Sequence, residues 1–212
     1  MKTANRLAGG TPGTLVAAGL LLLAAGASTP AAEGPAWHVD HPDVHITVPL
    51  KPGGAFAATS TALTGTLRLA DTAAASRPLK LAGEIALDLG TIDTGIALRN
   101  RHLRENYLEI AKGAGFDKAV LSNIQIADAD GEAFDGSSAF TANLLLHGMS
   151  REISGKAEVR REGDSRRVRA EFPLTMPDFG ITPPEYLGVG VGSRLMVKVQ
   201  FMATPAAGSA RD

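Results

Sequence analysis

The chain has 212 residues, a formal net charge of −1 and no cysteine. A charge this close to zero excludes recruitment of nucleic acid or of an anionic membrane by overall charge. The absence of cysteine excludes disulfides, a lipid anchor on cysteine, c-type haem attachment and zinc sites with cysteine ligands.

The N-terminus has the pattern of a secretory signal peptide. Lys2 and Arg6 precede an apolar run at residues 14–27, and its last three residues, Ala25, Gly26 and Ala27, fit a cleavage site. The run is too short for a transmembrane helix, and no later apolar run is long enough to span a bilayer. We expect residues 1–27 to be removed on export to the periplasm or outside the cell. An uncleaved N-terminal anchor is the alternative.

The rest of the chain is expected to form one domain. Residues 28–36 have the composition of a linker, residues 37–203 form the domain, and residues 204–212 are a disordered tail. Eight runs in the domain carry apolar residues at alternate positions, which predicts eight β-strands. The runs lie at residues 44–50, 63–69, 85–89, 120–126, 140–146, 153–159, 168–174 and 195–201.

Turn signals such as Asp130-Gly131 separate most of these runs and favour antiparallel neighbours. Strands with one apolar face must turn that face to a shared interior, either in a closed barrel or in a sandwich. We expect an all-β fold, an eight-stranded antiparallel barrel, because closure removes exposed sheet edges.

Two segments interrupt the alternation. Residues 96–112 carry apolar residues at helical spacing between charges and predict one short amphipathic helix after the third strand, ending near Gly113. Residues 177–192 are rich in proline and glycine and predict a long loop with room for one helical turn.

The triplet Asp93-Thr94-Gly95 resembles the catalytic motif of aspartic proteases. Such proteases need two carboxylates that share a proton, and no second triplet of this kind occurs in the chain. The favoured interpretation is that Asp93 and Thr94 cap the helix that follows.

Histidines offer the other candidate chemistry. His38, His41 and His45 lie close together in the sequence and are of a type that binds zinc or copper. Strand alternation places His38 on the face opposite His45, so solvent-facing histidines are the favoured interpretation. His147 ends a strand beside Gly148, and we expect it to have a structural role. No nucleophile elbow occurs, and we expect no enzymatic activity, no cofactor and no metal.

Several motifs together resemble the YceI-like family over residues 37–203. They are the helix start Thr94-Gly95, Arg99, His102-Leu103, the turn Leu146-His147-Gly148 and the loop Asp178-Phe179-Gly180-Ile181. In this resemblance Asp93-Thr94-Gly95 is a strand-to-helix junction rather than a protease motif. Asn100 departs from the pattern, because the family usually has Asp there.

The resemblance implies a lipocalin-like barrel, exported to the periplasm or secreted, that binds an isoprenoid or another amphiphilic lipid, such as a quinone-like or fatty lipid, in an apolar channel. We expect ten apolar residues of the strands to line that channel. Arg99 and His102 are expected to meet a polar head group at its mouth or, equally, to lock the helix to the rim of the barrel. The ten are Leu67, Leu69, Ile85, Leu87, Ile124, Leu144, Leu146, Phe172, Val197 and Val199. A ligand-free structural barrel and a metal-binding protein are the alternatives, and a homodimer is left open.

Overall fold

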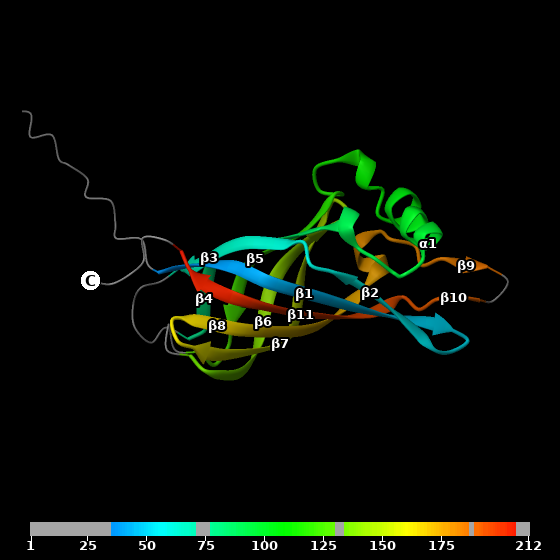
Figure 1. Cartoon of the computed structure of the whole chain (residues 1–212). Helices are drawn as coiled ribbons and strands as arrows, with labels where there is room; N and C mark the ends of the chain where they lie inside the picture. Colours follow the sequence, from blue (N-terminus) through cyan, green and yellow to red (C-terminus); the bar gives the residue numbers. More distant parts are fainter. Residues whose placement is uncertain (1–34, 71–76, 130–133, 187–188, 207–212) are drawn as a thin grey trace, which may run out of the picture. The chain divides into compact units, whose positions relative to one another are not determined.

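The computed structural model describes residues 35–70, 77–129, 134–186 and 189–206, all in one compact unit (Figure 1). The expected signal peptide at 1–27, most of the linker and the end of the tail lie outside the described residues.

Eight antiparallel strands close into a barrel. Each strand pairs with its neighbours in the order β1, β3, β4, β5, β6, β7, β8, β11, and β11 pairs back with β1. This confirms the predicted fold. Seven of the eight alternating runs lie wholly in one barrel strand, and the run at 85–89 lies in β4 except for its last residue, Leu89. The strands are β1 (Ala36–Lys51), β3 (Leu63–Leu69), β4 (Leu79–Asp88), β5 (Lys118–Ile126), β6 (Gly136–Leu146), β7 (Met149–Glu162), β8 (Ser165–Thr175) and β11 (Arg194–Pro205).

Three short strands extend one end of the barrel and were not predicted. β2 (Ala55–Ser60) forms a hairpin with the second half of β1, and β10 (Val189–Val191) joins β9 (Glu185–Tyr186) to the end of β1. Their sequences are alanine-rich or interrupted by proline and glycine, so they show no clear alternation. They add length to the wall at this end of the barrel (Figure 1).

A β-bulge in β1 changes which residues face the interior. The pairing of β1 with β11 shifts by one residue between Asp40 and Asp43, and His41 has a φ of 46°. Trp37 and Val44 are therefore both buried, although strict alternation would place them on opposite faces. For the same reason His38 and His45 are both on the outer face, so their predicted placement on opposite faces was wrong.

The stretch predicted as a single helix, residues 96–112, lies after β4, the third strand of the barrel, and consists of an α-helix, a π-helical turn and a short 3-10 turn. η1 (Leu89–Thr91) ends that strand, and α1 (Ala97–His102) then runs directly into a π-helical turn, η2 (Leu103–Tyr107). Glu109 adopts a left-handed φ of 51°, which ends this stretch before the short η3 (Ile110–Lys112). The predicted loop at 177–192 contains the helical turn η4 (Met176–Phe179) as well as β9 and β10.

None of the helices in the described part of the chain has the length and apolar character needed to cross a membrane.

Candidate functional site: an apolar barrel cavity

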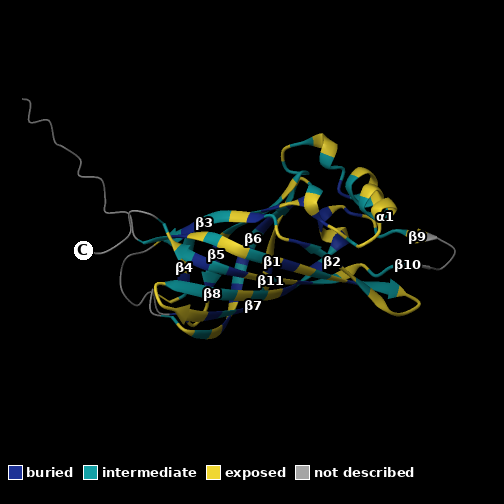
Figure 2. Cartoon of the chain, in the orientation of Figure 1, coloured by how far each residue is buried: buried dark blue, intermediate teal, exposed yellow. Residues whose placement is uncertain are grey.

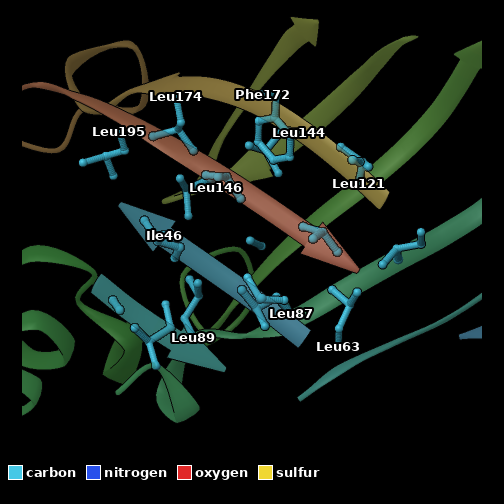
Figure 3. Close-up of a pocket in the computed structure, with 18 of the residues that line it drawn as sticks. Ile46, Leu63, Leu87, Leu89, Leu121, Leu144, Leu146, Phe172, Leu174 and Leu195 are labelled. Atoms are coloured by element: carbon cyan, nitrogen blue, oxygen red, sulfur yellow. The ribbon is translucent and has the colours of Figure 1, made fainter. Parts of the chain in front are cut away.

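The barrel encloses a cavity of about 740 Å³. Its walls are the inward-facing aliphatic and aromatic side chains of the barrel strands, and Figure 3 shows leucines of β4, β6 and β8 converging on it. The polar residues among those that line it are Thr94, Arg99, His102, Tyr107, Arg166 and Glu185. This volume lies in the range of cavities that hold one small molecule.

Small residues on the inner face provide the room. Ala58, Ala119, Ala157 and Ala170 all line the cavity where larger side chains would fill it. An eight-stranded barrel is otherwise just wide enough for its own side chains. The interior is therefore partly hollow, which differs from the packed interior expected of a purely structural barrel.

One glycine allows two large rings to pack at the wall. Phe140 and Phe172 meet edge to face, with ring centroids 6.1 Å apart. Gly155 lies between their strands, and a Cβ there would come within 2.8 Å of Phe140 and 2.7 Å of Phe172. The missing side chain thus leaves room next to the β7 backbone for the ring of Phe140 and for the Cβ of Phe172.

The structure brings all twelve of the residues predicted from the sequence to this cavity. Ten of them come from six barrel strands, and Arg99 and His102 come from α1. Whether these residues contact a ligand stays a prediction. Further lining residues were not named from the sequence; they include Trp37, Val44, Ile46, Val48, Leu63, Leu81, Ile96, Leu98, Leu121, Leu174, Leu195 and Phe201.

We use the term mouth for the rim formed by α1 with Ile96, by the β1–β2 hairpin, and by β9 and β10. The rim is held together in part by Arg99, whose guanidinium carbon lies 4.1 Å from the ring centroid of Phe56 on β2. This arrangement joins α1 to the hairpin through a cation–π contact. At the other end of the barrel Arg166 lies 4.8 Å from the ring centroid of Trp37.

Asn100 fixes the approach to α1. Its Oδ1 accepts hydrogen bonds from the Thr94 backbone N–H at 2.8 Å and the Thr94 hydroxyl at 2.6 Å, and its Nδ2 donates to Asp93 Oδ1 at 2.7 Å. The hydrogen bond from Asn100 is the main reason that the pKa of the Asp93 carboxyl lies below its ordinary value, and the hydrogen bond from the Gly95 N–H is the second. The residue before α1 is Ile96, without a side-chain cap, so the predicted capping of the helix by Asp93 and Thr94 was wrong. These two side chains instead stabilise the turn that leads into it.

His147 connects three loops next to the mouth. Its Nδ1 donates to the Phe179 carbonyl at 3.0 Å, because a carbonyl can only accept, and its Nε2 lies 3.0 Å from Glu109 Oε2. The ring also meets Phe116 edge-on at 4.8 Å. The structural role predicted for His147 agrees with these contacts.

Glu109 gives this connection a dependence on pH. Lys112 lies 2.7 Å from Glu109 Oε2, and this bond, together with that to His147, lowers the pKa of the Glu109 carboxyl. Because the pKa of Glu109 is lower in the folded state than in the unfolded state, its ionised carboxylate stabilises the fold at pH values above the unfolded pKa of about 4.3. This stabilisation is lost as the pH falls through the folded-state pKa. We expect Glu109→Gln to unfold at a lower temperature than the wild type at pH 7, and we expect the difference to shrink as the pH falls below the unfolded value.

Thermal unfolding across this pH range would measure the effect. Glu105→Gln is the matched control, because Glu105 is an exposed acid in the neighbouring η2 segment. If the unfolding temperatures of Glu109→Gln and the wild type differed by the same amount at every pH, Glu109 would not be the source of this pH dependence.

The three histidines near the N-terminal end of β1 do not converge. His38 Nδ1 lies 2.8 Å from Thr66 Oγ1, whereas His41 and His45 lie 3.7 Å and 3.2 Å from Asp40 and Asp43 respectively. Among the described residues there is no group of three or more His, Cys, Asp or Glu side chains that could hold a metal ion. The alternative of a metal site through these histidines therefore finds no support.

The fold and the cavity together define a small antiparallel barrel of the type that can hold a ligand inside. The family model described as YceI-like domain matches residues 37–203, and the chain belongs to this family. No curated protein sequence matches the chain.

Solved structures share the fold. One is described as a polyisoprenoid binding domain from Saccharophagus degradans implicated in plant cell wall breakdown; its TM-score is 0.60 at 15% identity, and the match covers 82% of this chain and 99% of that one. Another is Burkholderia cenocepacia BcnA, with a TM-score of 0.57 at 14% identity, covering 76% of this chain and 96% of that one. At these identities the likeness concerns the fold alone.

Proposed function

We propose that this chain is an exported, non-enzymatic binding protein that holds an isoprenoid or a related amphiphilic lipid inside the barrel. The observation that carries the proposal is the cavity of about 740 Å³ with almost entirely apolar walls. Membership of the YceI-like family supports it, as does the polyisoprenoid-binding description of a structural neighbour. The signal-peptide pattern supports a periplasmic or secreted location.

Burial of an alkyl chain supplies the binding energy. Each buried methylene contributes about 0.8 kcal/mol, so ten contribute about 8 kcal/mol, the scale of a micromolar dissociation constant before association costs. An aliphatic wall gives little preference among apolar chains, and selectivity therefore depends on length and on the polar end. We expect Arg99 and His102, which line the cavity at its mouth, to meet that polar end.

Native mass spectrometry of the mature protein from its own host tests the proposal. We expect a stoichiometric adduct that is lost on organic extraction and whose mass corresponds to a polyprenyl, quinone-like or fatty lipid. A clean ligand-free mass from folded protein, with no uptake of a polyprenyl lipid supplied in detergent, would contradict the proposal and favour the ligand-free structural barrel.

A further inference from the structure

Two large apolar side chains are exposed at the mouth of the cavity. Ile96 is 49% exposed and Leu98 is 53% exposed, and they are the exposed large hydrophobic residues among those that the structure describes. Both also line the cavity, so the exposed apolar surface is continuous with the apolar interior. Figure 2 shows α1 as largely exposed, at the end of the barrel that carries β9 and β10. Exposed apolar patches with a polar rim are typical of surfaces that bind a membrane or another protein.

The charges next to these side chains are basic. Residues 96–104 contain Arg99, Arg101, His102 and Arg104 and no acid, although the whole chain carries a net charge of only −1. Arg101 and His102 are exposed, whereas Arg104 donates to the backbone carbonyls of Asn100 and Gly90. The acids near the rim include Glu185, which pairs with Lys51 at 4.0 Å, and Glu105, which follows the basic stretch. At the mouth the positive charge thus lies on α1. Another group of arginines lies on β7 and β8 at the opposite end of the barrel, where Arg160 and Arg167 pair with acids.

From this combination we infer that the mouth docks on an anionic lipid bilayer, with Ile96 and Leu98 inserted between the head groups and Arg101 against the lipid phosphates. Apolar side chains flanked by arginine are the pattern by which surface-bound segments enter the interfacial region of a membrane. Each basic residue near an anionic surface adds to the attraction. The barrel would then stand with its mouth against the bilayer, and an apolar ligand could pass between them without crossing water.

Vesicle flotation tests the inference without requiring a ligand in the cavity. The probes are vesicles of equal parts phosphatidylglycerol and phosphatidylcholine, and vesicles of phosphatidylcholine alone. We expect the wild-type protein to float with the anionic vesicles and the double variant Ile96→Ser, Leu98→Ser to bind them at least about tenfold more weakly, since burial of one aliphatic side chain alone is worth about that factor.

The charge contribution has a matched control. Arg101→Glu should weaken binding about tenfold, because it reverses a charge at the membrane surface. Arg161→Glu makes the same change at an exposed position near the end of β7, at the end of the barrel away from the mouth, and should leave vesicle binding unchanged. Arg101 does not line the cavity, so Arg101→Glu should also keep the affinity for a lipid supplied in detergent.

Leu98→Trp provides a direct readout of insertion. Its fluorescence should shift to the blue on anionic vesicles, whereas Trp37, the natural tryptophan, is already buried. Equal binding of the serine double variant and the wild type, equal losses for Arg101→Glu and Arg161→Glu, or no spectral shift would each overturn the inference. So would a dimer in solution that the serine double variant converts to monomers, because the exposed pair would then be an interface between two copies. Loss of detergent-delivered lipid binding with vesicle binding intact would count against the proposed function alone.

Discussion

Replacement of Leu144 by tryptophan is expected to abolish binding of a long apolar chain and to leave the barrel folded. Leu144 is buried on β6 and lines the cavity (Figure 3). An indole there would occupy space that a ligand needs; displacement of about four methylenes at 0.8 kcal/mol each corresponds to a dissociation constant more than 100-fold higher. Since the cavity of about 740 Å³ can take the larger ring, we expect the free energy of unfolding to change by less than about 1 kcal/mol.

The neighbouring residue offers a matched control. Leu145 is partly buried on β6 and does not line the cavity, so Leu145→Trp makes the same chemical change on the other face of the strand. Titration with a polyprenyl lipid in detergent should show wild-type affinity for this variant. If Leu144→Trp instead kept its affinity, the cavity would not be the binding site. If it destabilised the barrel by about 1–3 kcal/mol, the interior would behave as a packed core.

The barrel could be predicted from the sequence because its strands have one apolar and one polar face. Alternation then reports directly which side chains face inward, and eight such runs leave few ways to bury their apolar faces. β2 could not be found in this way, because alanine at positions 55, 57 and 58 gives no contrast between its faces. The helix prediction had the right place but the wrong continuity, since the left-handed backbone at Glu109 has no sequence signal as clear as a glycine.

The lining of the cavity could be predicted in part for the same reason. Nine of the ten apolar residues named from the sequence lie on regular stretches of strand, and Ile124 lies next to an irregularity of β5 at Asn123. Trp37 was missed because the bulge at His41 inverts the alternation between it and Val44. Ile96 and Leu98 were missed because the packing of α1 against the mouth decides which of its side chains face the cavity. Helical spacing in the sequence does not specify this tertiary arrangement. Whether the interior is hollow also depends on the sum of many side-chain volumes, and no single run reveals it.

Gly83→Ala is expected to lower the free energy of unfolding by about 3 kcal/mol, because it combines backbone strain with a clash. Gly83 lies on β4 with a φ of 103°, and a Cβ there would collide with the carbonyl oxygen of Thr66 and lie 3.4 Å from Leu67 Cα on β3. The pairing of β4 with β5 also shifts register between Leu81 and Glu84, so this glycine lies where the barrel wall bends. Thermal unfolding should show a midpoint roughly 6–12 °C lower than that of the wild type.

Gly54→Ala separates the two contributions. Gly54 has a comparable φ of 90° in the β1–β2 hairpin, but a Cβ there would meet no atom within 4 Å. Only the backbone strain should remain, and we expect a loss of about 1 kcal/mol. The difference of about 2 kcal/mol between the two variants then measures the close approach of β3 and β4 at the bend. If both variants lost the same free energy of unfolding, β3 and β4 would be able to move apart around the added Cβ without any loss of stability. The close approach of the two strands would then not constrain the wall of the cavity.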